Sequence, residues 1–402
     1  MPRSSWRDIP SGIWALGFVS LLADVSSEMV HALLPVYLVS VLGASMVTVG
    51  VIEGIAEATA SITRIFSGAL SDWLGKRKFL AALGYGLAAF TKPMFPLASS
   101  VGWLAAARFI DRLGKGIRGA PRDALVADIA PEDLRGASFG LRQSLDTTGA
   151  FVGPLLAIGL MWLLADDFQA VFWIAVVPAF IAVALIVLAV REPGRPAGLR
   201  RIANPLSLAE AKRMGGTYWR VVAIAAVFTL ARFSEGFLTL RGQSVGLPIM
   251  LVPAVLVVMN VAYAFAAYPV GVLSDRVGRT GLLAVGLVLL VGADIVLAFI
   301  PSIAGVAAGA VLWGLHMGFT QGLLATLVAD TAPAELRGTA YGYFNLLTGL
   351  AMVPASMLAG FLWDTAGPQA AFLAGAAFAA LAALGLLAVK DRFGSRAPFG
   401  RP

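Results

Sequence analysis

The chain has 402 residues, none of which is cysteine, and only two histidines, His31 and His316. Without cysteine it cannot form disulfides, thiolate metal sites or a cysteine nucleophile, and two histidines argue against a histidine-rich metal site. Charged residues are also scarce, at 13% of the chain, whereas an ordinary soluble domain has about 25%. So little charge cannot cover a water-facing surface, which excludes a soluble globular enzyme.

Apolar residues are abundant instead, at 59% of the chain with a mean hydropathy of +0.84. Crossing a bilayer takes about 20 residues per helix, so twelve spans use about 240 residues. Long uncharged runs mark most of these spans, and the remainder are broken by isolated charges. We therefore predict helices over residues 12–42, 47–72, 78–98, 101–125, 137–164, 168–190, 219–242, 249–274, 281–300, 304–329, 338–362 and 370–389.

The basic residues, which give a net charge of +7, gather in alternate loops of this scheme. This positive-inside pattern predicts cytoplasmic termini in the inner (plasma) membrane, and it argues against a nucleic-acid partner. Arg241 is the one basic residue expected on an outer loop. The first apolar stretch continues to Leu42, which favours a retained span over a cleaved signal peptide. The predicted division is residues 1–193, a cytoplasmic connector over residues 194–218, and residues 219–402.

The two halves of the chain repeat each other. Residues 68–77 (GALSDWLGKR) match residues 271–279 (GVLSDRVGR) at an offset of 203, and residues 125–136 (LVADIAPEDLRG) match residues 327–338 (LVADTAPAELRG) at 202. Thr148, Gly149 and Pro154 recur 200 residues later. A nearly constant offset predicts two parallel six-helix halves, an arrangement that places a substrate near the bilayer midplane between halves that rock alternately.

The first of these matches resembles the loop motif of the major facilitator superfamily, and the resemblance covers the whole chain. It implies an all-α polytopic membrane protein with twelve transmembrane helices in two parallel-repeat six-helix bundles, similar to bacterial drug exporters. In that family the loop motif closes an inner gate. The gate residues implied here are Gly68, Asp72, Gly75, Lys76 and Arg77, echoed by Asp275, Gly278 and Arg279.

Three predicted helices of the first half carry charges along one face. Charges inside a span are expensive and usually face the bundle interior or a water-filled cavity. Arg108, by its resemblance to the family's helix 4 motif, is implied in proton coupling, and structural ion pairing is the alternative. On the second helix, Glu53 is expected near the outer, solvent-facing end. The candidates for proton coupling are Asp24, Glu28, Glu57, Arg108, Asp111 and Arg112.

The fifth predicted helix contains Gly149, Gly153 and Pro154 in a Gly-x-x-x-Gly-Pro pattern. Small residues four apart allow close packing of helices, and proline removes a backbone hydrogen bond. The pattern resembles the family's antiporter motif, with Ala157 at its final glycine. The resemblance favours export, and generic helix packing is the alternative interpretation.

Helices 1, 4, 7 and 10 line the cavity in this family, and here they carry most of the intramembrane charge. This coincidence favours a polar or amphiphilic substrate. The predicted cavity residues are His31, Lys115, Arg232, Glu235, Asn260, Tyr263, Trp313, His316 and Gln321.

We therefore expect a monomeric secondary transporter, without cofactor or metal, that exports a small organic molecule against proton entry. A proton-coupled importer or a facilitator is the nearest alternative, and efflux of a divalent metal is a weaker one. A sensor that uses a transporter fold belongs to a different class, and no appended domain supports it. An enzyme is not expected, because no phosphate-binding loop or paired nucleophile and base is found.

Overall fold

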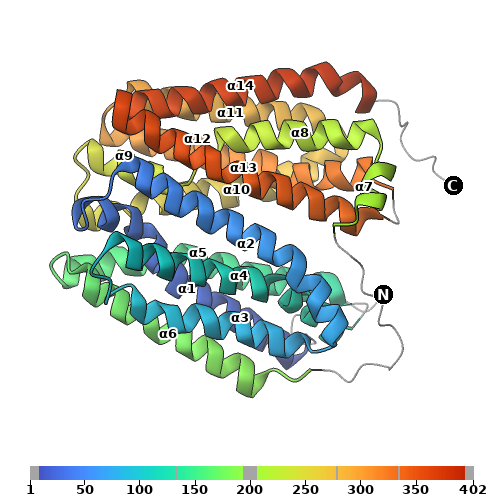
Figure 1. Cartoon of the computed structure of the whole chain (residues 1–402), viewed down its shortest axis with the longest axis horizontal. Coiled ribbons are helices and arrows are strands. Elements are labelled where there is room, and N and C mark those ends of the chain that lie inside the picture. Colours follow the sequence, from blue (N-terminus) through green and yellow to red (C-terminus); the bar gives the residue numbers. More distant parts are fainter. Residues whose placement is uncertain (1–8, 132–133, 193–205, 278, 334–335, 394–402) are drawn as a thin grey trace. The chain divides into compact units, whose positions relative to one another are not determined.

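A computed structural model describes residues 9–131, 134–192, 206–277, 279–333 and 336–393, and throughout these ranges the chain is helical without strands (Figure 1). Gly278 lies outside the described residues, as do the side chains of Asp72, Asp275 and Arg279. The predicted loop motif is therefore described only in part.

The helices of the first half follow the predicted spans closely. They are α1 (Ser11–Ser40), α2 (Met46–Leu74), α3 (Arg77–Thr91) with the short 3-10 helix η2 (Lys92–Met94), α4 (Val101–Ile129), α5 (Arg135–Leu163) and α6 (Phe168–Ala189). Gly75 lies between α2 and α3 with a φ of +65°, a backbone conformation that glycine adopts without steric cost.

The second half contains α7 (Leu208–Arg213), α8 (Gly216–Ala231), α9 (Gly236–Ser244), η4 (Ile249–Leu251), α10 (Ala254–Val277), α11 (Arg279–Phe299), α12 (Ile303–Thr331), α13 (Arg337–Ala366) and α14 (Pro368–Phe393). One prediction is wrong here, because the continuous helix predicted over residues 219–242 is broken into α8 and α9. The helix α7 lies within the predicted connector. The break also corrects the expectation for Arg241, which lies in α9 and is only 4% exposed.

Ten segments of the described chain are long and apolar enough to cross a membrane, and α8 with α9 counts as one of them. The remaining two predicted spans are α3 with η2 and α4. The helix α3 has only 15 residues, and α4 carries many charges in its 29 residues. Together with the ten, these two give the predicted twelve-span, all-α architecture.

The chain divides into two compact units. The first comprises Met1–Ala44, Ile55–Pro205 and Leu247–Val257, and the second comprises Ser45–Gly54, Leu206–Gly246 and Val258–Pro402. These units are not the two sequence halves, and the division into residues 1–193, 194–218 and 219–402 stays a prediction.

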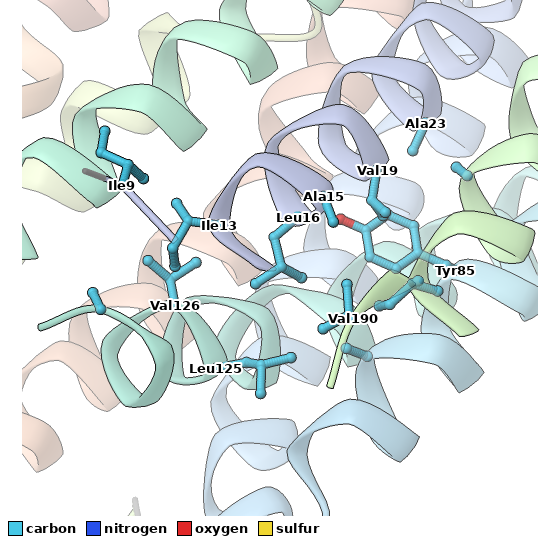
Figure 2. Close-up of a cluster of buried hydrophobic side chains, with 14 residues drawn as sticks. Ile9, Ile13, Ala15, Leu16, Val19, Ala23, Tyr85, Leu125, Val126 and Val190 are labelled. Carbon is cyan, nitrogen blue, oxygen red and sulfur yellow. The ribbon is translucent and has the colours of Figure 1, made fainter. Parts of the chain in front are cut away.

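An apolar cluster lies at one end of the first unit (Figure 2). Ile13 and Leu16 of α1 are fully buried beside Leu125 and Val126 of α4. Tyr85 of α3 packs against the same cluster and points its hydroxyl at Ser20 Oγ, 3.4 Å away. Burial of this apolar surface fixes the helices that carry the charged groups described below.

The internal repeat is visible in helix packing at an offset of 202 residues. Ser100 and Ser302 each cap the N-terminus of a helix, α4 and α12 respectively. A Cβ atom on Gly84 would lie 2.6 Å from the backbone nitrogen of Arg118, and one on Gly286 would lie 2.6 Å from Thr320 Cγ2. The packing of α3 on α4 is therefore repeated by α11 on α12, and residues of the two pairs correspond one to one.

Candidate functional site

The helix α1 presents its predicted carboxylates to charged partners. Arg118 of α4 donates to Asp24 Oδ1 at 3.4 Å. One turn further along α1, Glu28 Oε2 lies 3.3 Å from His31 Nδ1. Asp24 and Glu28 are thus held by different partners, although they share one helix face.

Three residues of the predicted charged face of α4, Arg108, Asp111 and Arg112, are buried, and their partners come from two other elements. Asp111 pairs at 2.8 Å with Lys92, and both side chains are at most 3% exposed. Arg112 lies 3.4 Å from Glu57 of α2. Arg108 is 1% exposed. Lys92 was absent from the predicted site, although a lysine inside an apolar run was itself the signal.

Sequence reasoning also missed the continuation of this network along α4. Arg122 lies 3.3 Å from Asp146 of α5, and Arg64 of α2 lies 3.0 Å from Asp123. Arg118 lies three residues after Lys115, and Arg122 lies four residues after Arg118. The helical periodicity of the charged face therefore extends to both arginines. Most of these ion pairs join two different helices of the first unit.

A cavity of about 280 Å³ opens among these groups within the first unit. Four basic and three acidic side chains line it: Arg64, Lys115, Arg118, Arg122, Asp24, Glu57 and Asp146. Three predicted residues, Asp24, Glu57 and Lys115, therefore share one cavity. Such a site can hold a polar ligand, and it can exchange protons with water through its carboxylates.

The glycine motif of α5 packs directly against the carboxylate-bearing part of α1. A Cβ atom on Gly149 would lie 2.5 Å from Leu21 O, and one on Gly153 would lie 2.8 Å from Glu28 Cβ. Pro154, next to Gly153, is buried inside α5. Only glycine at these positions allows α1 and α5 to pack so closely.

In the second unit, the predicted residues of helix 7 lie where the helix is interrupted. Arg232 and Glu235 are half-buried in the break between α8 and α9. Between them, Ser234 Oγ lies 3.5 Å from Glu53 Oε2. Glu53 is fully buried, so the expectation that it faces solvent is wrong. Interrupted helices bring polar backbone groups to membrane depth, and they do so where a cavity or a binding site exists.

Three other predicted cavity residues, Tyr263, Trp313 and His316, interact with groups at this break. Tyr263 of α10 interacts electrostatically with Arg232 and Glu235, and His316 of α12 does so with Arg232. Trp313 packs edge-on against His316, with ring centroids 5.5 Å apart. Asn260 and Gln321 are half-buried on α10 and α12.

The loop motif is anchored within the first unit. Arg77 Nη1 donates to Ala124 O at 2.8 Å and forms an ion pair with Asp128, both near the end of α4. Lys76 is exposed, and Gly68 lies in α2 against Ala120. The gating role that the motif implies stays a prediction.

A model of the Major Facilitator Superfamily matches residues 16–356 and 238–401. An uncharacterized MFS-type transporter of Methanocaldococcus jannaschii is 32% identical over 397 residues, covering 95% of each chain. The inner membrane transport protein YajR of Escherichia coli is 25% identical over 92% of this chain and 81% of its own.

A shorter match is the multidrug resistance protein MdtH of Photorhabdus laumondii, 31% identical over 40% of this chain and 39% of its own. Among solved structures, a peptide transporter POT has a TM-score of 0.80 at 16% identity and covers 98% of this chain and 97% of that chain. The nucleoside transporter NupG has a TM-score of 0.79 at 14% identity, covering 94% and 99%. Such distant likenesses show the fold alone. The match to the family model and the full-length relatives establish that the chain belongs to the Major Facilitator Superfamily and is a multi-pass membrane transporter.

Proposed function

We propose that this transporter exports a small organic molecule in exchange for protons, by alternating access. The observation that carries the proposal is the charged cavity of the first unit, which Asp24 of α1 lines at 3.4 Å from Arg118 of α4. Protonation of Asp24 removes its attraction to Arg118, so one proton changes the energy that holds two helices together. A ligand that prefers one arrangement of those helices is then coupled to the proton.

Antiport requires that substrate and proton compete. A basic or hydrogen-bond-donating group that contacts the Asp24 carboxylate satisfies this condition, because the carboxylate must be ionised to receive it. Outward direction is supported by the resemblance of Gly149, Gly153 and Pro154 to the antiporter motif and by the name of the relative MdtH. We further propose that the protein is a monomer in the inner membrane and that both of its termini lie in the cytoplasm.

Proton-coupled import is the second candidate, and one observation favours it. Lys115 lines the cavity and forms no ion pair with any residue in the described ranges, while each carboxylate of the lining has a cationic partner. An anionic substrate that binds Lys115 would favour protonation of the nearby Asp24. Substrate and proton would then move in the same direction.

The test is a substrate screen with purified protein in liposomes under an imposed proton gradient. An exporter inserted in one orientation accumulates substrate on the side from which protons leave, and an importer accumulates it on the side to which protons flow. Accumulation that ignores the gradient for every substrate tested would contradict proton coupling in both forms.

Orientation can be measured separately, because the chain contains no native cysteine. Single cysteines at Ser45 and Asp167 should react with an impermeant maleimide added outside intact cells, and one at Ala197 should react only after the cells are opened. The reverse labelling would overturn the positive-inside assignment.

A further inference from the structure

A buried acid on α11 was not among the predicted site residues. Asp294 is fully buried, and neither of its carboxyl oxygens has a hydrogen-bond partner within the described residues. An ionised carboxylate without a partner is strongly disfavoured in an apolar interior, whereas the neutral acid is tolerated there. Isolated acids at membrane depth generally mark a function.

The surroundings of Asp294 are aromatic. A Cβ atom on Gly375 of α14 would lie 2.8 Å from Asp294 Oδ2 and 3.1 Å from the Phe233 ring. Phe233, in the break between α8 and α9, packs against Trp313 and Phe372, in each case with ring centroids 5.6 Å apart. The carboxyl group of Asp294 therefore lies among aromatic side chains, beside the break between α8 and α9.

The internal repeat shows which residues of the first unit correspond to Asp294 and its neighbour Trp313. At the offset of 202 residues, Asp294 corresponds to Lys92, and Trp313 corresponds to Asp111. In the first unit these positions form an ion pair at 2.8 Å. In the second unit an acid stands at the position of the cation and tryptophan at the position of the acid, and the buried Trp313 Nε1–H also has no acceptor in the described chain.

Charged and titratable groups on the neighbouring elements leave Asp294 unpaired. On α12 the nearest such residue to Trp313 is His316, whose Nδ1 contacts Trp313 O. On α9, Arg241 donates through Nε to Leu297 O at 2.9 Å, one turn of α11 from Asp294. Arg232 and Glu235 flank Phe233 in the break. The described side chains of α14, residues 368–388, include no charged group. None of these groups forms an ion pair with Asp294.

We propose that Asp294 is a second proton-binding site of the transporter, located in the second unit and separate from the charged cavity of the first. The site is Asp294 among Phe233, Trp313 and Gly375. In the described arrangement the proton is bound and the carboxyl is neutral. On release, the O–H bond breaks, the proton passes to water and the carboxylate requires a donor.

Arg241 fits that donor role. Its Nη2 is buried without an acceptor in the described chain, and α9 is a helix separate from α8. Proton release at Asp294 thus favours a different position of α9. The inference rests on the proposed proton coupling, because it adds a second proton to the same transport cycle.

Proton counting tests the site without a substrate. Purified wild-type protein and Asp294→Asn, in lipid nanodiscs, are titrated between about pH 5 and pH 9, a range in which ordinary exposed carboxyls stay ionised. We expect the wild type to exchange one proton more per chain than Asp294→Asn. The control Asp167→Asn, which removes an exposed carboxyl, should match the wild type. Equal counts for wild type and Asp294→Asn would overturn the proposal.

Infrared spectra of the same samples supply the second readout. The protonated-acid C=O band in the wild type should weaken in Asp294→Asn, and the variants Asp294→Asn and Asp294→Leu should unfold at temperatures close to that of the wild type. Two variants that both unfold readily would show that an ionised, paired Asp294 is required, which also overturns the proposal. Absence of proton-driven transport with an intact Asp294 titration would reject the proposed function and leave this site standing.

Discussion

The two units pack corresponding helices in the same way but bury different polar side chains between them. Between α3 with η2 and α4, the first unit places the ion pair of Lys92 and Asp111. Between α11 and α12, the second unit places Asp294 and Trp313 at the corresponding positions, amid aromatic rings. A duplicated scaffold therefore keeps its helix contacts, as Gly84 and Gly286 show, while its buried charges are free to change.

The difference assigns separate tasks to the units. In the first unit, ion pairs join α1, α2 and α5 to α4, so protonation at one position alters several helix contacts. In the second unit, Arg232, Ser234 and Glu235 lie together at one helix break. We infer that the first unit responds to charge throughout its interior, whereas the second responds at a hinge.

The largest expected effect is on coupling in the first unit. Asp24→Asn should reduce proton-driven accumulation of substrate at least about tenfold, within the usual range of coupling free energies, while substrate exchange without a gradient persists. The measurement is uptake into liposomes with and without a pH difference. Asp364→Asn, at an exposed helix-capping acid of the second unit, is the matched control and should retain accumulation. Equal losses in both variants would remove the distinction between the units.

The next effect concerns stability. Lys92→Met leaves Asp111 without its partner in a buried site, and breaking one side of such a pair costs about 3–5 kcal/mol. The double variant Lys92→Met with Asp111→Leu should recover much of this loss, because it removes both charges. Unfolding of the purified protein in detergent gives the comparison. A single variant as stable as the wild type would mean that the pair is not what holds η2 against α4.

A smaller effect is expected from the contact of α5 with α1. Gly153→Ala places a methyl group against Glu28 Cβ and Val25 O, 2.8 and 2.9 Å away, and such overpacking costs about 1–3 kcal/mol. Gly159→Ala, on the same helix, meets nothing within 4 Å and should be neutral or gain up to about 1 kcal/mol in helix propensity. Thermal unfolding and transport rate are measured for both. Indistinguishable variants would mean that the close contact of Gly153 with α1 does not stabilise the protein.

The smallest effect involves an acid that caps a helix within the second unit. Asp364 Oδ1 and Oδ2 accept hydrogen bonds from the backbone nitrogens of Met46 and Val47, at 3.0 and 2.9 Å. Asp364→Ala should lower unfolding stability by about 0.5–2 kcal/mol, and Asp364→Asn should lose less because one acceptor remains. Proton-driven accumulation should be unchanged in both, which would separate a structural acid from a coupling one.

Most of the fold follows from the sequence, because uncharged runs of about 20 residues have few alternatives to a spanning helix. The break at residues 232–235 could not be found in this way. It contains neither glycine nor proline, and it depends on tertiary contacts such as that of Ser234 with Ser356. The short helix α7 was not predicted for another reason, since its six residues are too few to show a periodic apolar pattern.

The site was predicted unevenly for a similar reason. Helical spacing found Asp111 and Arg112 because their periodicity lies within one helix. It could not identify Lys92 as the partner of Asp111, because that contact depends on how α4 packs against η2. Asp294 was not predicted, because it is a single acid in an apolar helix. Its interest follows from the repeat, in which it corresponds to the ion-paired Lys92.

In the proposed antiport, proton and substrate compete for the carboxylates of the first unit. The decisive experiment adds a substrate from the liposome screen to purified protein in unbuffered nanodiscs and follows a pH indicator dye. We expect proton release on binding to the wild type and none on binding to Asp24→Asn. Proton uptake on binding to the wild type would contradict antiport and establish movement of proton and substrate in the same direction.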